Sequence, residues 1–213
     1  MEIVFLFYDG MTALDAVGPH EILCRLPNAS VKRVALKSGL INTDSSLILK
    51  AEYSLSNVQR ADILVVPGSG SATTLREYPD VLNWLRKIHT TTTWTTSVCT
   101  GSLILGATGV LAGLKATSHW ATLDRLHIWG AKPINARVVE DGKIITAAGV
   151  SAGIDMALAL ASKVAGQKFA ETLQLGIEYD PAPPFDVGSP DKADPLILES
   201  LRKRMVSLFE SIN

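Results

Sequence analysis

Two short runs of mainly apolar, β-favouring residues constrain the fold of this chain most: residues 3–7 (IVFLF) and 62–66 (DILVV), in which only Asp62 is polar. Neither run alternates apolar with polar residues, as a strand with one wet face does. Each ends at turn-forming residues, Asp9-Gly10 after the first run and 67–70 (PGSG) after the second. These patterns predict strands covered on both faces, which is the usual setting of a parallel sheet between two layers of helices.

Helical segments alternate with the strands along the whole chain. Further strands are expected at 31–36, 47–51 and 92–98, and helices at 12–26, 79–88, 102–106, 151–165, 169–179 and 196–212. In the first helix, Gly18-Pro19 is expected in the first turn or at a kink. Asp141-Gly142, between two apolar pairs, predicts a hairpin at one sheet edge. The alternation predicts one α/β domain over 1–213, a three-layer sandwich on a mostly parallel sheet.

Composition and charge exclude several classes of protein. The 20 Lys and Arg residues balance 21 Asp and Glu, which argues against nucleic acid or an anionic membrane surface as a partner. The N-terminus lacks the basic start of a signal peptide, and the later apolar stretches are too short or too interrupted to span a bilayer. With two cysteines, Cys24 and Cys99, the composition favours a soluble, cytoplasmic protein with free thiols. The long segment 180–195 contains five prolines, which suits a functional or interface-forming loop.

Cys99 is the most informative residue. It stands in 97–101 (SVCTG), between the strand at 92–98 and the helix at 102–106, so the sequence places its thiol on a sharp turn at the carboxyl edge of the sheet. The helix N-terminus behind it is expected to favour the thiolate and lower the thiol pKa. The same position also suits a small, inert core cysteine, and the residue types alone leave both interpretations open.

Other candidate residues are expected at the same edge. Asp15 begins the first helix, where its carboxylate either faces Cys99 or caps backbone N–H groups. Gly68, Ser69 and Gly70 form a turn whose N–H groups suit an anion, although such a turn is most often only a turn. His119 and Trp120 suggest a base or an apolar wall near the cysteine.

No ligand spacing for a metal is present among the histidines and cysteines, so no metal is predicted. Asp155, within the small-residue helix at 151–165, is expected to have a hydrogen-bonded structural role.

Taken together, these motifs resemble the ThiJ/PfpI family, which shares the class I glutamine amidotransferase-like sandwich, and within it the isonitrile hydratases. The matching segments occur in order along nearly the whole chain: 7–10 (FYDG), 14–19 (LDAVGP), 65–68 (VVPG), 97–101 (SVCTG), 117–120 (TSHW), 153–155 (GID), 178–185 (EYDPAPPF) and 188–190 (GSP).

The resemblance implies a cofactor-free enzyme that hydrates isonitriles to N-substituted formamides. It assigns Cys99 as nucleophile, Asp15 as the carboxylate beside it and Thr100 as the following hydroxyl residue, and it implies a small-molecule substrate and a homodimer. Relatives with Glu in place of the aspartate, or with His directly after the cysteine, have other activities. Related transcription regulators carry a further DNA-binding domain, which we do not expect in a chain that ends at Asn213. One departure is Ser69, where similar hydratases have a second glycine.

Two alternatives remain open from the residues. A glyoxalase-like or deglycase-like enzyme would use the same cysteine on reactive carbonyl compounds, although Asp15 disfavours it. A redox sensor would instead oxidise Cys99 reversibly and signal through a partner.

Overall fold

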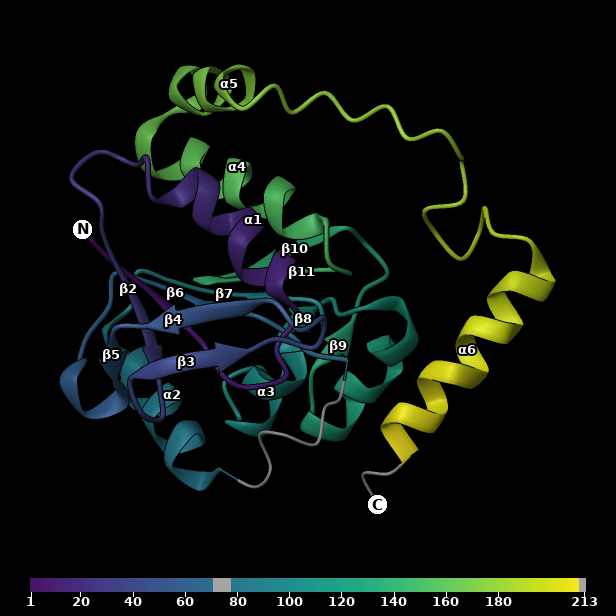
Figure 1. Ribbon diagram of the computed structural model, residues 1–213, viewed down its shortest axis with the longest axis horizontal. Coiled ribbons are helices and arrows are strands. Elements are labelled where there is room, and N and C mark those ends of the chain that lie inside the picture. Colours follow the sequence, from purple (N-terminus) through teal and green to yellow (C-terminus); the bar gives the residue numbers. More distant parts are fainter. Residues whose placement is uncertain (71–77, 211–213) are drawn as a thin grey trace.

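A seven-stranded sheet, in the order β10-β11-β7-β6-β1-β2-β5, forms the centre of the protein within the residues that the structure describes (Figure 1). This computed structural model describes residues 1–70 and 78–210, with side chains as far as Met205. All neighbouring strands run parallel except β10 and β11, which form the expected hairpin at one edge. The strands of the sheet are β1 Glu2–Leu6, β2 Ser30–Ala35, β5 Tyr53–Ser54, β6 Ile63–Val66, β7 Trp94–Val98, β10 Val138–Asp141 and β11 Ile144–Ala147.

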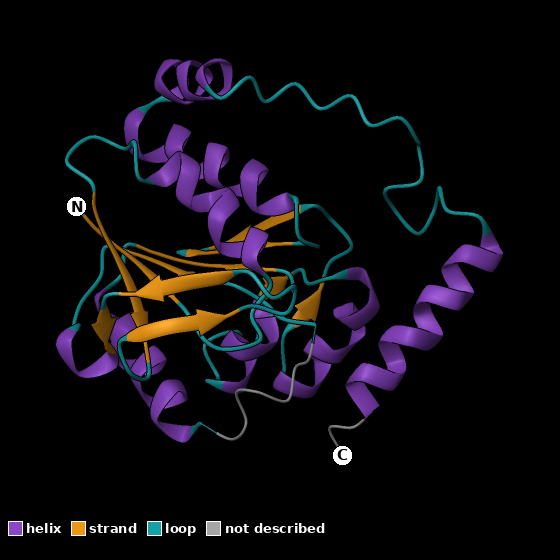
Figure 2. Cartoon of the chain, viewed as in Figure 1, coloured by secondary structure: helices purple, strands orange, loops and turns teal. Residues whose placement is uncertain are grey.

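Helices cover both faces of this sheet, as Figures 1 and 2 show. On one face lie α1 Ala13–Leu23, α4 Ala152–Ala165 and α5 Gln167–Gly176, and on the other α2 Pro79–Thr91, α3 Gly101–Ala107 and the 3-10 helix η3 Trp120–Trp129. Successive residues of β1 enter different cores: Ile3 and Phe5 pack in the first layer, Val4 and Leu6 in the second. The uninterrupted apolar run in the sequence therefore reflects burial on both faces, and the predicted three-layer α/β sandwich is confirmed.

The Gly18-Pro19 pair lies inside α1 and not in its first turn. A Cβ on Gly18 would lie 3.1 Å from Cγ1 of Ile154, and one on Gly153 would lie 3.0 Å from Cγ of Pro19. These small residues let α1 and α4 approach closely, so the pair is a packing feature of the helix interface.

Several short elements beside the sheet were not predicted from the sequence. The predicted strand at 47–51 is β4 Ile48–Ala51, but it pairs with an unforeseen strand, β3 Gly39–Asn42, in a separate antiparallel ribbon. The helix η3 was also not foreseen, because its ten residues follow a 3-10 path with no clear apolar stripe. Two paired two-residue strands, β8 Lys115–Ala116 and β9 Lys132–Pro133, precede and follow it in the chain.

The chain ends in an arm that leaves the body after α5. Residues 180–194 form an irregular segment and lead to α6 Pro195–Glu210, which lies away from the sheet in Figure 1. The predicted helix extends to 212, and residues 211 and 212 lie outside the described part. In the described residues, no helix has the length and apolar character needed to cross a bilayer.

Candidate active site

Cys99 occupies a strained turn between β7 and α3. Its φ angle of 59° lies in the left-handed region, which is costly for a residue with a side chain and persists only where the surroundings enforce it. Gly101 is part of that enforcement, since a Cβ there would lie 2.1 Å from the carbonyl oxygen of Val66. The Cys99 N–H donates to the carbonyl oxygens of Ala147 and Ala148, at 3.0 Å each. The predicted cysteine turn is therefore present and tightly packed.

Asp15 meets the turn after β6 and does not cap its own helix. Its side chain is fully buried, and Oδ2 accepts the N–H of Gly68 at 2.9 Å. The other oxygen, Oδ1, is buried without a hydrogen-bond partner among the described residues. A buried carboxyl oxygen without a partner is costly, and it is also one that remains available to a reacting group.

The electrostatics of Asp15 and Cys99 are coupled. Burial raises the pKa of Asp15 to about 7, and the Gly68 N–H and the Cys99 thiol oppose that rise. Burial also raises the pKa of Cys99, and the nearby Asp15 carboxylate adds to the rise. The site thus holds a protonated thiol beside a carboxyl group that titrates near neutral pH, which is the pKa that suits an acid and base catalyst.

The expected lowering of the Cys99 pKa is therefore wrong for the resting protein. The N–H groups of Thr100 and Val150 do donate toward the sulfur and favour the thiolate. Their effect is smaller than that of burial and of the Asp15 charge. Because these donors remain in place when charge develops on sulfur, they would stabilise the thiolate during a reaction.

The N–H groups of the turn 68–70 are used differently from the anion-binding role expected of them. The N–H of Gly68 donates to Asp15, and the N–H of Ser69 donates to Thr100 Oγ1 at 2.8 Å. Thr100 Oγ1 in turn donates to the carbonyl oxygen of Ser69 at 2.9 Å. Two of the three predicted amides are therefore engaged within the protein, and Gly70 follows them at the end of the described segment. The turn and the Thr100 hydroxyl position Asp15 and Cys99 relative to each other.

His119 and Trp120 lie next to the cysteine turn without touching the sulfur by any hydrogen bond in the described structure. Ser118, just before them, donates from Oγ to the carbonyl oxygen of Cys99 at 3.2 Å. His119 Nδ1 accepts the N–H of Ala121 at 3.2 Å, and burial lowers the pKa of His119. The imidazole is therefore a neutral helix cap, and its predicted role beside the cysteine stays a prediction.

Tyr8 is the main residue at the site that sequence reasoning missed. Its hydroxyl donates to the carbonyl oxygen of Pro67 at 2.8 Å, directly before the amide that holds Asp15. Burial and the Asp15 charge raise the pKa of Tyr8, so it stays a neutral donor. The signal was available in part, because Tyr8 directly follows the apolar run at 3–7 and so reaches the carboxyl edge.

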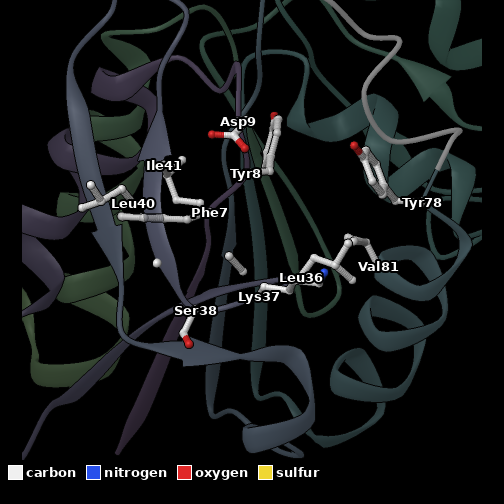
Figure 3. Close-up of a pocket in the computed structure, with 12 residues that line it drawn as sticks. Phe7, Tyr8, Asp9, Leu36, Lys37, Ser38, Leu40, Ile41, Tyr78 and Val81 are labelled. Atoms are coloured by element: carbon white, nitrogen blue, oxygen red, sulfur yellow. The ribbon is translucent and has the colours of Figure 1, made fainter.

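A cavity of about 350 Å³ lies beside Tyr8 (Figure 3). Apolar side chains line it, among them Phe7 just after β1, Leu36 just after β2, Ile41 of β3 and Val81 of α2. In Figure 3 the Tyr8 hydroxyl is directed away from Leu36 and Lys37. Tyr8 lines this cavity, and its hydroxyl bonds to Pro67 directly before the Gly68 amide that holds Asp15, so Tyr8 borders both the cavity and the candidate site.

Metal ligands do not gather at this site. In residues 1–70 and 78–210, no group of three or more His, Cys, Asp or Glu side chains is arranged to hold a metal ion. Both cysteines are free thiols. Asp155 has the predicted structural contacts: it pairs with Arg137 and accepts the Tyr179 hydroxyl at 2.8 Å.

Comparison with known proteins agrees with the geometry. The model of the DJ-1/PfpI family matches residues 1–163. The chain is 40% identical over 204 residues to an isonitrile hydratase of Pseudomonas putida, covering 96% of this chain and 90% of that protein. A deglycase of Pyrococcus horikoshii is 25% identical over 148 residues, covering 68% of this chain and 89% of the relative.

Solved structures show the same fold. A ThiJ/PfpI family protein from Pseudomonas syringae superposes with a TM-score of 0.94 at 37% identity, covering 97% of this chain and 86% of that one. Oxidized DJ-1 of Toxoplasma gondii has a TM-score of 0.74 at 20% identity, over 84% of this chain and 99% of its own. The resemblance read from the cysteine turn and its neighbouring motifs is confirmed, and the chain belongs to the DJ-1/PfpI family.

Proposed function

We propose that this protein hydrates isonitriles to N-substituted formamides, with Cys99 as nucleophile and Asp15 as the group that moves the proton. The observation that carries the proposal is the buried pair of a protonated thiol and a carboxyl group whose pKa is about 7. The 40% identity to an isonitrile hydratase supports the same reaction. The enzyme class is then a lyase that adds water to a carbon–nitrogen triple bond.

The first step joins the cysteine to the substrate. The terminal carbon of an isonitrile accepts a proton and a nucleophile at the same atom. Asp15 takes the proton from the Cys99 thiol and delivers it to this carbon while the sulfur forms a bond to it. The product is a thioimidate, R–N=CH–S–Cys99, in which one C–S bond and one C–H bond have formed and no atom has left.

The second step releases the product. A water molecule adds its oxygen to the thioimidate carbon and one of its protons goes to nitrogen. The C–S bond then breaks, the hydroxyl proton returns through Asp15 to the sulfur, and R–NH–CHO leaves. The balance is one isonitrile and one water for one formamide, and neither step draws on a cofactor.

The surrounding groups make this proton transfer possible. The N–H groups of Thr100 and Val150 stabilise sulfur when it is negatively charged. Gly68 holds one oxygen of Asp15, which leaves the unpartnered Oδ1 to exchange the proton. Thr100 and Ser69 act as positioning residues in this scheme, because their mutual hydrogen bonds hold the turn after β6 against the turn that carries Cys99.

The test compares two substrates on the full-length protein. Purified protein is incubated with cyclohexyl isonitrile in one arm and with methylglyoxal in the other, and the formamide and the lactate are quantified. Formamide production at a higher kcat/KM than lactate production supports the proposal. Lactate as the dominant product would favour the deglycase-like alternative, to which the Pyrococcus relative points. Turnover of neither substrate would favour the redox sensor.

We further propose that the enzyme works as a homodimer in the cytoplasm. The family resemblance implies the dimer, and the free thiol at Cys99 supports a reducing compartment, because the scheme above needs an unoxidised sulfur. Peptide mapping with a thiol-alkylating reagent, applied to freshly lysed cells, should label Cys99 as a free thiol. A stable sulfinate at this position would contradict the reducing setting.

A further inference from the structure

Asp44 is an acidic residue that the proposed reaction does not use, although it contacts the residues that lead into Asp15. It stands in the turn between β3 and β4, and in Figure 1 this turn lies close to the start of α1. Its N–H donates to the carbonyl oxygen of Met11 at 3.0 Å, and its Oδ2 accepts the Thr12 hydroxyl at 2.5 Å. The Asp44 carboxylate is therefore fixed to a residue three positions before Asp15 in the chain.

The same contacts bring Asp44 to the turn that follows β6. A Cβ on Gly70 would lie 3.8 Å from Oδ2 of Asp44. Thr12, which donates its hydroxyl to Asp44, also donates its N–H to the carbonyl oxygen of Gly68 at 2.9 Å. Because the Gly68 amide in turn holds Asp15, one short chain of contacts joins the two carboxyl groups. Asp44 is exposed, whereas Asp15 is fully buried, so Asp44 lies on the solvent side of this chain.

The charge of Asp44 acts on the reacting pair without compensation. Burial is the main cause of the raised pKa of Asp15, and the Asp44 carboxylate adds to the rise. In the described residues, no Lys or Arg is among the groups that oppose it. Neither carboxyl group forms an ion pair within residues 1–70 and 78–205. A second negative charge therefore stands beside a buried site whose own acid titrates near neutral pH.

An unpaired carboxylate of this kind discriminates between substrates by their charge. It repels an anion that approaches Cys99, attracts a cation and has little effect on a neutral molecule. A substrate must also reach the buried, unpartnered Oδ1 of Asp15, which exchanges the proton, so it enters the field of both carboxyl groups.

We propose that Asp44 is a specificity-determining residue of this site, which selects isonitriles with a neutral or cationic substituent and excludes those that carry a carboxylate. The inference rests on the proposed function, because it concerns the substrate of the same cysteine.

The first experiment compares two isonitriles of nearly the same shape on the full-length protein. 3-Isocyanopropanamide is neutral, and 3-isocyanopropanoate carries one negative charge. Wild type should hydrate the amide with a kcat/KM at least about tenfold higher than the carboxylate. Asp44→Asn should reduce this ratio about fivefold, which is the order expected for one partly screened unit charge. Asp44→Glu should keep the wild-type ratio, and so should the control Asp124→Asn, which removes an exposed charge from η3.

Two further readouts separate the effect of charge from a structural role of Asp44. In about 1 M salt, the wild-type ratio should fall toward that of Asp44→Asn, because salt screens exposed charges. The pH midpoint of kcat/KM for the amide should move below about 7 in Asp44→Asn, since the charge that adds to the raised pKa of Asp15 is gone. A variant that only loosened the turn would lower the turnover of both substrates and change neither readout.

The second experiment does not depend on isonitrile turnover. Iodoacetamide and iodoacetate alkylate thiols by the same displacement of iodide, and only iodoacetate carries a negative charge. Peptide mapping measures both rates at Cys99 and, as an internal reference, at Cys24, whose sulfur lies 3.6 Å from a guanidinium nitrogen of Arg25. Wild type should favour iodoacetamide at Cys99 more strongly than at Cys24. Asp44→Asn should reduce the preference at Cys99 about fivefold and leave that at Cys24 unchanged.

The outcomes distinguish this inference from the proposed function. A wild-type ratio of amide to carboxylate turnover near one, or an unchanged ratio in Asp44→Asn, would overturn the inference and leave the proposed function valid. If neither isonitrile were hydrated, the proposed function would be wrong, and the alkylation rates would decide the role of Asp44. An alkylation preference at Cys99 that is lost in Asp44→Asn would then support charge selection, and one that persists would overturn it.

Discussion

The turn around Cys99 and the C-terminal arm use packing in opposite ways. At the turn, a residue in a costly backbone conformation and a buried carboxyl group are held by contacts from β6, β11 and the loops that follow them. On the arm, apolar side chains lie in solvent and few contacts restrain them. One copy of the chain therefore contains the complete reacting pair under close packing, whereas the arm leaves its large apolar side chains uncovered by the rest of the described chain. Substitutions at the turn should change chemistry and stability together, and substitutions on the arm should leave the reacting pair intact.

Removing the nucleophile should have the largest effect. Cys99→Ala is expected to lower isonitrile turnover by at least about a thousandfold, because a nucleophile and its base act as one unit. Thermal stability should change little, since the side chain becomes smaller by one buried atom. Cys24→Ala, at a partly exposed cysteine, serves as the control and should keep wild-type turnover. A Cys99→Ala enzyme with near-normal kcat in a formamide assay would rule out covalent catalysis.

Adding one methyl group at the Cys99 turn should disturb the packing most. Gly101→Ala is expected to destabilise the protein by more than about 3 kcal/mol, because its Cβ would lie 2.1 Å from the backbone oxygen of Val66, which cannot move away freely. The matched control is Gly176→Ala at the end of α5, where a Cβ meets nothing within 4 Å. That change should be neutral or stabilising by up to ~1 kcal/mol. Urea unfolding measures the free energy of unfolding of both variants. Equal changes in Gly101→Ala and Gly176→Ala would contradict the close packing of the Cys99 turn.

Asp15→Asn separates catalysis from stability. Turnover should nearly vanish, and in wild type kcat/KM should fall as the pH drops below about 7, where Asp15 becomes protonated and no longer accepts the thiol proton. The free energy of unfolding of wild type should change with pH in the opposite direction to its kcat/KM. Because the folded pKa is above the ordinary value of 3.8, wild type is most stable below that value and loses stability as the pH rises through about 7.

Asp15→Asn carries no ionisable group at position 15, so it does not lose stability as the pH rises through about 7. At pH 8 it should be more stable than wild type by about 4 kcal/mol at most, from ~1.4 kcal/mol for each pKa unit. At pH 4 the difference should be small. Denaturant titrations at pH 4 and pH 8 measure the difference in the free energy of unfolding between Asp15→Asn and wild type. If the variant's advantage over wild type were smaller at pH 8 than at pH 4, the Asp15 carboxylate would not be a costly buried charge.

The smallest effect is expected at Tyr8. Tyr8→Phe removes the hydrogen bond from the hydroxyl to Pro67 and leaves the ring in place, so kcat should fall about tenfold or less. The pH dependence of kcat should also shift, because the Gly68 amide would hold Asp15 less firmly. Tyr8→Ala removes the wall next to the apolar cavity and should improve the relative kcat/KM for bulky isonitriles over methyl isonitrile. Unchanged selectivity in Tyr8→Ala would show that the cavity stays separate from the reacting groups.

Local patterns in the sequence were sufficient for much of the fold. The apolar runs at 3–7 and 62–66, the Asp141-Gly142 hairpin and the turn at Cys99 all depend on neighbouring residues, and the structure confirms them. The resemblance led to Asp15, but the residues alone could not separate a catalytic carboxylate from a helix cap. That choice depends on Gly68, which is distant in the sequence and adjacent in space.

The electrostatics of the site could not be predicted in the same way. A helix N-terminus is visible in the sequence and favours a thiolate, whereas the burial that outweighs it is produced by the whole fold. The donors Val150 and Ser118 likewise come from loops whose positions no local pattern defines. The long proline-rich segment was recognised as a candidate interface, but its exposed apolar residues became meaningful only once the arm was seen apart from the body.

In the proposed reaction, Cys99 and Asp15 pass a proton to the isonitrile carbon while the sulfur bonds to that carbon. Rapid acid quench of the full-length enzyme mixed with excess cyclohexyl isonitrile, followed by intact-mass and peptide mass spectrometry, tests this most directly. We expect a transient mass increase equal to the whole isonitrile, located on Cys99 and disappearing as the formamide accumulates. Formation of the formamide with no adduct on Cys99 at any time point, under conditions where the quenched thioimidate is shown to survive, would rule out the proposed reaction.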